Sequence, residues 1–321
     1  MSMAMACIPT IDLSAFTEGD SDGNKKTIVD KVGQACSEYG FFQIINHGIP
    51  LSLMRQALDM SKTFFDYPLE EKLKSSPIPG SPLAAGFNIR EKHLTGKEYL
   101  VTTSPSSSFN VYPANPPGYR DLLIEMFTNM VKLSSTMAGI ISECLGLPPD
   151  FLEEFNNDRS WDVLTSLSYP AATDDNGGNI GVAAHKDVSC FTFVYQDQSG
   201  GLEVKLDGKW VPILPATEDA LVVNVGDMLQ VLSNDKFMSP WHRVVKLKGR
   251  ARNSFVFFYN LAGDKFIEPL PQFTKEVGVA PKYTSFLNKE YLQLRSKTKL
   301  DLTAEGEQKI IDVTHYAINT T

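Results

Sequence analysis

The sequence is poor in the features that mark several broad classes of protein. Its four cysteines lie far apart and form no C-x-x-C pair, which argues against a disulfide framework and favours reduced thiols in an intracellular protein. No stretch approaches the roughly 18 apolar residues that a membrane span requires, and residues 1–10 lack the basic and apolar segments of a signal peptide. We therefore expect a cytoplasmic protein with no membrane partner.

Positive charge is also scarce. The 321 residues include 30 Lys and Arg against 38 Asp and Glu, a formal net charge of -8, so there is no basic field to attract nucleic acid. With 42% hydrophobic and 21% charged residues, the composition is that of a globular protein and excludes disordered, collagen-like and coiled-coil classes. No internal repeat is visible, which argues against a solenoid or propeller. We expect a monomer that acts on a small molecule.

The chain changes character after Trp161. Before it, helical periodicity is strongest over 28–39, 51–67 and 119–145, whereas residues 75–117 are rich in Pro, Ser and Gly and are expected to be irregular and to face the substrate. After it, short alternating segments separated by turn residues indicate a closed or double-sheet β architecture. These segments are 162–169, 190–196, 202–206, 220–225, 241–247 and 252–259, and a last helix is expected around 285–297. The resulting regions are 1–117 at the N-terminus, 118–160 with a long supporting helix, 161–265 as the β core and 266–321 as a C-terminal helical segment.

Two histidines and one aspartate form a candidate metal site. In an extended strand His185 and Asp187 would point to one face, and His242 lies in another strand-like segment. Two histidines and a carboxylate are the ligands of non-haem Fe(II) sites that keep open positions for a co-substrate and dioxygen. The same ligand types also occur in zinc hydrolases, so these three residues alone do not decide the chemistry.

A candidate anion site follows the second histidine. By strand alternation Arg252, Ser254 and Phe258 share one face of an apolar segment. A buried guanidinium requires an anionic partner, either an internal carboxylate or a dicarboxylate co-substrate. Tyr169 ends another alternating segment and could present its hydroxyl to the same anion. A zinc hydrolase has no use for this arginine and serine.

Together these motifs resemble the plant 2-oxoglutarate and Fe(II)-dependent dioxygenases of the isopenicillin N synthase-like type, flavonoid-type members above all. Further matches occur in chain order at 8–12, 40–48, 200–204 and 224–227. The resemblance implies a mainly β fold with flanking helices, built on a double-stranded β-helix (jelly roll) core with an N-terminal α/β region.

The resemblance also implies roles for individual residues. His185, Asp187 and His242 would bind Fe(II), while Arg252, Ser254 and Tyr169 would hold the distal carboxylate of 2-oxoglutarate. Dioxygen is the other co-substrate, ascorbate a reductant, and succinate and CO2 the expected by-products of hydroxylation or desaturation. His47 falls in a structural motif of the family. Two departures, Leu167 in place of a common Asn and Asn253 within Arg-x-Ser, bear on the affinity for 2-oxoglutarate.

The expected substrate is a small hydrophobic metabolite of plant secondary metabolism, with a flavanone as the leading candidate, as in flavone synthases and flavanone hydroxylases. Aromatic side chains are expected to line or cover the pocket, namely Phe258, Phe191, Tyr195, Phe109 and Tyr112. A hormone acid such as an auxin or gibberellin stays open because of the basic residues Arg90, Lys92 and Lys97, and an alkaloid stays open too. Other possibilities are an ascorbate-using iron oxidase and a non-catalytic jelly-roll binding protein.

Overall fold

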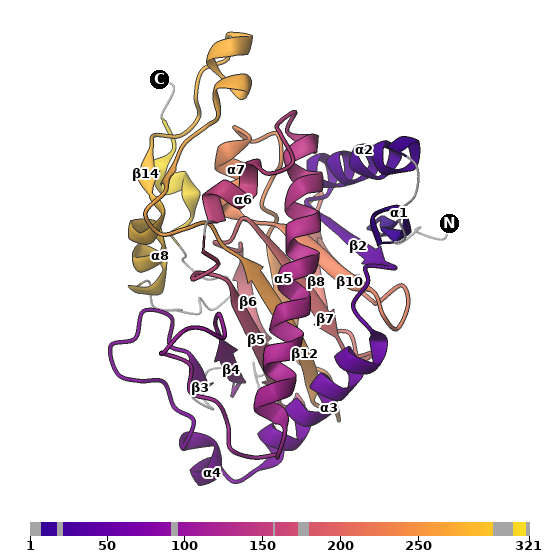
Figure 1. The fold of residues 1–321 in the computed structure, drawn as a ribbon, viewed down its shortest axis with the longest axis vertical. Helices are drawn as coiled ribbons and strands as arrows, with labels where there is room; N and C mark the ends of the chain where they lie inside the picture. The colour runs from indigo at the N-terminus through magenta and orange to yellow at the C-terminus, as the bar shows by residue number, and fades with distance from the viewer. Residues whose placement is uncertain are drawn as a thin grey trace.

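The structure is a computed structural model that describes residues 8–17, 22–90, 96–156, 158–172, 180–297 and 311–318. Within these residues two β-sheets pack against each other, and helices cover the outer face of the larger sheet (Figure 1). The fold is mainly β with flanking helices, as the sequence predicts. No helix in the described parts of the chain combines the length and apolarity that crossing a membrane needs.

The larger sheet has eight strands. Only β1 and β2 run parallel, and every other neighbouring pair in it is antiparallel. In spatial order the strands are β1 (Thr10–Asp12), β2 (Phe41–Ile45), β10 (Leu221–Val225), β7 (Phe191–Gln196), β12 (Arg252–Tyr259), β5 (Val163–Tyr169), β4 (Glu98–Thr102) and β3 (Gly86–Ile89).

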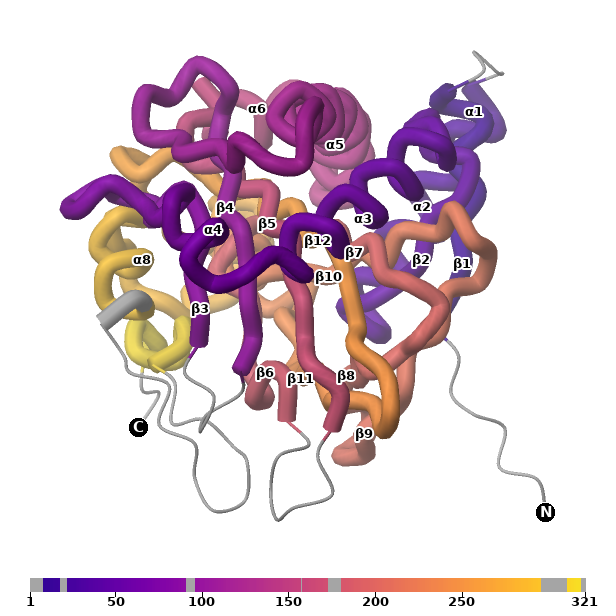
Figure 2. Tube along the Cα trace, turned by 90° about the horizontal axis from the view of Figure 1, so that it is seen from below, coloured from indigo at the N-terminus to yellow at the C-terminus, as the bar shows by residue number. Residues whose placement is uncertain are grey.

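The smaller sheet has four antiparallel strands and lies on the side of the large sheet opposite the helices (Figure 2). Its strands, in spatial order, are β6 (Ile180–His185), β11 (His242–Val245), β8 (Leu202–Leu206) and β9 (Lys209–Ile213). A further pair, β13 (Phe266–Ile267) with β14 (Phe286–Leu287), follows the core.

The large sheet separates two hydrophobic cores, and β7 shows how. All six of its residues are buried, because both faces of the strand are covered. Phe191, Phe193 and Tyr195 contribute to the core beneath the helices, whereas Val194 contributes to the core between the sheets. The two-residue period of a strand therefore decides which side chains can reach a site between the sheets.

The helices cover the outer face. The longest, α5 (Tyr119–Cys144), buries an apolar stripe at helical spacing, and its Phe127 lies with its ring centroid 5.5 Å from that of Phe257 on β12. The others are α1 (Ser14–Thr17), α2 (Asp22–Glu38), α3 (Leu51–Asp66), α4 (Leu69–Leu73), α6 (Phe151–Asn156), α7 (Asp227–Leu232) and α8 (Asn288–Lys297), with short 3₁₀ turns at Pro271–Phe273, Lys275–Val277 and Val313–Tyr316.

The prediction of an irregular segment over 75–117 is wrong in part, because β3 and β4 form a hairpin that extends the large sheet. These strands are four and five residues long and flanked by Pro, Ser and Gly, so their alternation is too brief to stand out. Pairing of β4 with β5, a tertiary contact, stabilises them. The hairpin brings new side chains to the space between the sheets.

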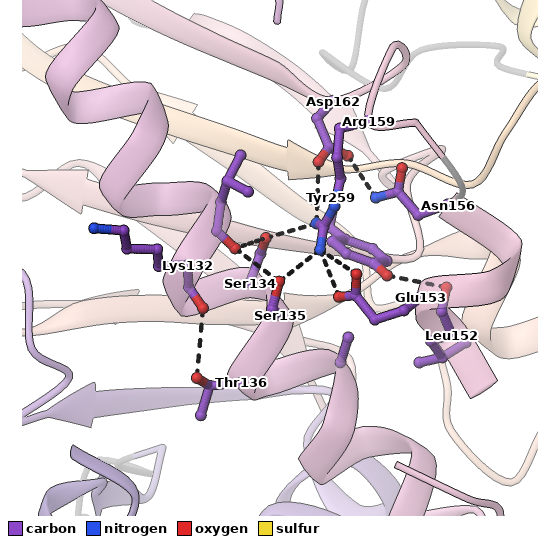
Figure 3. A network of polar contacts seen from close by, with 12 residues as sticks. Lys132, Ser134, Ser135, Thr136, Leu152, Glu153, Asn156, Arg159, Asp162 and Tyr259 are labelled. Carbon is purple, nitrogen blue, oxygen red and sulfur yellow. Dashed lines mark hydrogen bonds and ion pairs between the residues drawn. The ribbon is translucent and has the colours of Figure 1, made fainter. Parts of the chain in front are cut away.

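A polar network fastens α5 and α6 to the start of β5 (Figure 3). Arg159 donates to Ser134 and Ser135 on α5, to Glu153 on α6 and to the fully buried Asp162. Burial raises the pKa of Asp162 to about 7, although Arg159 opposes the shift. This ion-pair network lies on the helix-covered face of the large sheet, away from the smaller sheet.

Candidate metal centre and co-substrate pocket

Three elements bring the predicted metal ligands together. His185 ends β6 and His242 begins the adjacent β11, where the two residues are directly opposite each other. Asp187 lies two residues beyond β6, outside the strand that the sequence predicts for it, and the loop turns its carboxylate back toward both imidazoles. Its Oδ1 is 3.5 Å from Nε2 of each histidine. The ligand atoms of all three residues lie within 4.8 Å of one another, which suits a single ion.

Backbone carbonyls fix the orientation of both imidazoles. Nδ1 of His185 lies 2.8 Å from the carbonyl oxygen of Ala183, and Nδ1 of His242 lies 3.2 Å from that of Pro240. A carbonyl only accepts, so each Nδ1 carries the proton and each Nε2 presents a lone pair toward Asp187. Neutral, preoriented imidazoles of this kind are what a metal ion requires.

The carboxylate of Asp187 is held just as firmly. Its Oδ2 accepts hydrogen bonds of 2.8 Å from Thr192 Oγ1 on β7 and from Asn224 Nδ2 on β10, which leaves Oδ1 for an ion. Sequence analysis includes Asn224 in the motif at 224–227 but assigns it no role, and it does not identify Thr192. A polar residue inside each of these apolar strands was the available signal.

The electrostatics of the three groups are coupled. Burial works against the charge of Asp187, but His242 and His185 together hold its pKa well below the ordinary value. Burial and the neighbouring His242 lower the pKa of His185, whereas Asp187 overcomes burial and raises the pKa of His242. Asp187 thus keeps a negative charge beside both imidazoles, and a bound cation would displace the proton that the raised pKa of His242 favours.

Arg252 is 2% exposed and makes hydrogen bonds to uncharged groups in the core. Its Nε donates to the carbonyl of Gly200, and its two terminal nitrogens donate to Ser254 Oγ and Gln196 Oε1, at 2.8 to 2.9 Å. The ring of Tyr169, which pairs with Arg252 across β5 and β12, lies 5.2 Å from the guanidinium carbon. The carboxylate of Asp197 acts on this cation electrostatically but accepts its hydrogen bonds from the backbone NH groups of Asn253 and Ser199. An anionic ligand would supply a direct ionic partner for the guanidinium.

Two glycines make room for this arrangement. A Cβ at Gly201, which has φ +93°, would lie 2.7 Å from the carbonyl of Val245 and 3.3 Å from Cδ of Arg252. A Cβ at Gly181 would lie 2.8 Å from the ring of Tyr169. Both contacts are too close for a larger side chain, so these positions require glycine.

One cavity of about 110 Å³ joins the metal ligands to the arginine. Its wall includes all six residues predicted for metal and co-substrate, together with aliphatic side chains from both sheets and Phe258. Leu167, one of the two departures, forms part of this apolar wall. The other, Asn253, points to the opposite side of β12, as alternation dictates, and does not line the cavity.

Four of the five predicted aromatic residues lie elsewhere. Side chains of β7 alternate between its two faces. Phe191 and Tyr195 pack beneath the helices, whereas Thr192 and Val194 face the cavity. Phe109 is 43% exposed and lines a separate cavity of about 430 Å³ with Trp161 and several serines. Tyr112 packs against the helix-side core near Arg120. The prediction that Phe191 and Tyr195 line the cavity is therefore wrong, and Phe258 is the one of the five that lines it. That Phe109 and Tyr112 cover the substrate stays a prediction.

The remaining histidines stand apart from the site in the described chain. His47 is buried and accepts a hydrogen bond from the backbone NH of Ile49 at Nδ1, so its Nε2 donates to the carbonyl of Asp219. This bonding is structural, as the sequence predicts. His315 packs edge-on against Tyr316, and His93 lies outside the described residues, as does Lys92.

The C-terminal segment supports the metal loop from outside. Arg295 on α8 donates to the carbonyl of Lys186, between the two ligands of the loop. Tyr291 donates to Asp227, whose backbone NH in turn donates to the carbonyl of Asp187. Burial raises the pKa of Asp227 to about 6, with Arg295 opposing the shift. The sequence predicts a helix around 285–297, but sequence reasoning missed this support of the metal loop.

The jelly-roll fold, the His-Asp-His cluster and the buried arginine define a non-haem iron oxygenase that uses a dicarboxylate co-substrate. Comparison with known proteins agrees. Residues 159–261 match the 2OG-Fe(II) oxygenase superfamily, and residues 8–108 match the N-terminal region described as non-haem dioxygenase in morphine synthesis.

Individual relatives match most of the chain. Flavanone 3-dioxygenase 2 of Oryza sativa subsp. japonica is 33% identical over 260 residues, which are 79% of this chain and 73% of the relative. Gibberellin 3-beta-dioxygenase 1 of Arabidopsis thaliana is 32% identical over 277 residues, 83% of this chain and 76% of the relative. The crystal structure of a full-length Neurospora crassa protein in complex with alpha-KG and 5-formyluracil superposes with a TM-score of 0.80 at 26% identity, covering 92% of this chain and 97% of that one.

The chain therefore belongs to the 2OG-Fe(II) oxygenase superfamily. It is a dioxygenase, an oxidoreductase whose cofactors are Fe(II) and 2-oxoglutarate.

Proposed function

We propose that this dioxygenase hydroxylates or desaturates a small, largely apolar metabolite while 2-oxoglutarate is converted to succinate and CO2. The observation that carries the proposal is that one cavity has the three metal ligands and Arg252 with Ser254 in its wall. Its other lining residues are mostly aliphatic, and they include one phenylalanine, Phe258.

Each of these residues has a task in the proposed reaction. His185, Asp187 and His242 would hold Fe(II), which with 2-oxoglutarate and dioxygen supplies the oxidant that removes hydrogen from a C–H bond. Arg252 and Ser254 would bind the distal carboxylate, and the Tyr169 ring packs against that guanidinium. The apolar wall would exclude water and orient the reacting carbon toward the metal ligands.

Similarity over the whole chain favours no single substrate class. Relatives named for flavanone and gibberellin oxidation are 33% and 32% identical to this chain, so identity does not favour either. A flavanone is a candidate because relatives are named for flavanone oxidation. The cavity adds no support for it, because Phe191, Tyr195, Phe109 and Tyr112, which could have stacked on a flavanone, do not line it. The cavity wall also includes Lys97, which favours an acidic substrate as the second candidate.

The test is succinate release under Fe(II), 2-oxoglutarate and ascorbate, with a panel of flavanones, auxins, gibberellins and alkaloids. We expect at least one compound to stimulate succinate formation in step with its own oxidation. Asp187→Ala should abolish this activity with an unchanged circular dichroism spectrum, whereas Asp264→Ala, which removes an exposed carboxylate in a turn, should not.

Other results would overturn the proposal. Oxidation without succinate would indicate an iron oxidase that uses a different reductant. Absence of iron-dependent turnover together with tight binding of a small molecule would indicate a non-catalytic jelly-roll protein.

A further inference from the structure

A turn near the C-terminus lies against the loop that carries two of the metal ligands. This C-terminal turn, residues 311–318, contains the 3₁₀ helix Val313–Tyr316 and lies beside α8 and β14 (Figure 1). The metal loop, residues 185–187, has His185 and Asp187 at its ends and Lys186 between them. The side chain of Lys186 reaches the turn, where its Nζ lies 3.9 Å from Oδ2 of Asp312.

The contact between Lys186 and Asp312 is buried. The two side chains are 9% and 10% exposed, so little water screens their charges. The same ammonium lies 5.9 Å from the ring centroid of Trp241, the residue before His242. Lys186 is thus adjacent in sequence to two metal ligands, and it lies close in space to the neighbour of the third.

A guanidinium joins the same two segments through their backbones. One terminal nitrogen of Arg295 donates to the carbonyl of Lys186 and the other donates to that of Ile311, both at 2.7 Å. Lys186 and Arg295 also act electrostatically on the buried carboxylate of Asp227. Two cations are therefore set against two carboxylates, Asp227 and Asp312, beside the metal loop.

The C-terminal turn is itself firmly held. Val313 is fully buried in the helix-side core, and the ring of Tyr316 stacks on that of Phe286 with the centroids 4.0 Å apart. Oδ1 of Asp312 accepts a hydrogen bond from the backbone NH of Thr314, which leaves Oδ2 for the lysine. The turn can therefore act as a fixed point for whatever is bound to it.

The residues that join the two segments act on a metal ion only through its ligands. Lys186, Asp312 and Arg295 do not line the cavity that contains the metal ligands. Ligand atoms have to be held within about 0.5 Å of their binding positions. Because His185 and Asp187 flank Lys186 directly, a movement of the backbone at Lys186 displaces a ligand.

We propose that Lys186 is a positioning residue for the iron: its ionic contact with Asp312 fixes the metal loop to the C-terminal turn, and the affinity for Fe(II) depends on that contact. The inference goes beyond the proposed function, since it concerns the binding of the metal and holds for any substrate. It gives the C-terminal turn a role in metal binding, although no residue of the turn lies in the cavity wall.

The experiment measures iron affinity and stability separately in the full-length chain. Fe(II) is titrated anaerobically against a chelating dye, and urea denaturation of the metal-free protein gives the free energy of unfolding. Hydrogen exchange is followed at the backbone of residues 185–190 in the metal-free protein. The variants are Lys186→Met, Lys186→Arg, Asp312→Asn and the double variant Lys186→Met/Asp312→Asn. Asp312→Asn removes the charge and keeps an oxygen for Thr314.

Lys72→Met is the matched control. Lys72 is 6% exposed and Lys186 is 8% exposed, and Nζ of Lys72 lies 2.6 Å from Oε2 of Glu98. Neither Lys72 nor Glu98 lines the cavity. The control therefore removes a buried lysine from an ion pair without changing a residue of the metal loop or of the C-terminal turn.

We expect the dissociation constant for Fe(II) to rise about 10- to 100-fold in Lys186→Met, as is typical when a group that orients a metal ligand is lost. Asp312→Asn should have a comparable effect, and the double variant should lose no more than the single variants, because all three remove the same contact. Lys186→Arg keeps the charge and should recover most of the affinity.

The control should separate positioning from stability. Lys72→Met should lower the free energy of unfolding but bind Fe(II) within about twofold of the wild type, because its ion pair does not touch the metal loop. Hydrogen exchange at residues 185–190 should be faster in Lys186→Met and Asp312→Asn and unchanged in Lys72→Met.

Three results would overturn the proposal. The first is a Lys186→Met protein that binds Fe(II) within about twofold of the wild type. The second is a double variant in which the two losses multiply, because Lys186 and Asp312 would then act independently. The third is a loss of iron affinity in Lys72→Met as large as that in Lys186→Met, which would make the effect one of general stability. Should Lys186→Met not fold, Asp312→Asn decides in its place, and an unchanged affinity in that variant would overturn the proposal.

Discussion

The hydroxyl of Thr192 tests how the protein tunes its metal centre. Thr192→Val keeps the shape and the β-branched character of a buried strand residue but removes the donor to Asp187 Oδ2. The carboxylate then keeps only Asn224 as its partner on that oxygen, and Ser189 also loses a hydroxyl contact of 2.8 Å. A hydrogen bond to a charged group contributes about 1.5 to 3 kcal/mol, so we expect the dissociation constant for Fe(II) to rise about 10- to 100-fold.

The assay is an anaerobic equilibrium titration of Fe(II) against a chelating dye, with circular dichroism to establish that the variant is folded. Thr102→Val is the control, since it makes the same change at a buried position of β4 outside the cavity. Its affinity for Fe(II) should equal that of the wild type. A Thr192→Val protein that binds Fe(II) within about twofold of the wild type would refute the role assigned to this hydrogen bond.

Three other predictions concern the co-substrate and the fold. Arg252→Met should raise the KM for 2-oxoglutarate about 100-fold, since it removes the buried cation, and change the substrate KM far less; equal changes in both would contradict the assignment. Arg159→Met leaves Asp162 buried without its cation, so urea denaturation should show a loss of about 3 to 5 kcal/mol in the free energy of unfolding, and a loss below about 1 kcal/mol would show that the network is dispensable. The raised pKa of Asp162 means that its protonated form is favoured in the folded state, so this group stabilises the fold below pH 3.8 and that contribution is lost as the pH rises through about 7. Asp162→Asn should remove this part of the pH dependence, and an unchanged dependence would count against it.

Much of the fold and of the metal and co-substrate site was predictable from the sequence, because these residues belong to local patterns. The two-residue period places Arg252, Ser254 and Phe258 on one face, and β12 has that arrangement. The helical stripe that predicts residues 119–145 corresponds to α5, which ends at Cys144. Such patterns are written in consecutive residues and need no knowledge of tertiary contacts.

What the sequence did not reveal depends on contacts between distant segments. The hairpin of β3 and β4 is stabilised by pairing with β5, and only that pairing shows that Lys97 reaches the cavity. On β7, Phe191 points to the helix side and Thr192 points to the metal ligands, and the sequence alone does not show which face is which. The short distance in sequence between Asp187 and Phe191 therefore led to the wrong expectation that Phe191 lines the cavity. The support of the metal loop by Arg295 links residues more than a hundred positions apart.

The central claim is that one cavity holds Fe(II) on three protein ligands and 2-oxoglutarate on a buried arginine. The most direct test is a crystal structure of the full chain grown anaerobically with Fe(II) and 2-oxoglutarate, with anomalous data at the iron edge. We predict one iron peak bonded to Nε2 of His185, Oδ1 of Asp187 and Nε2 of His242, and a 2-oxoglutarate whose distal carboxylate contacts Arg252 and Ser254. An iron peak elsewhere, or a co-substrate carboxylate that does not contact Arg252, would contradict it.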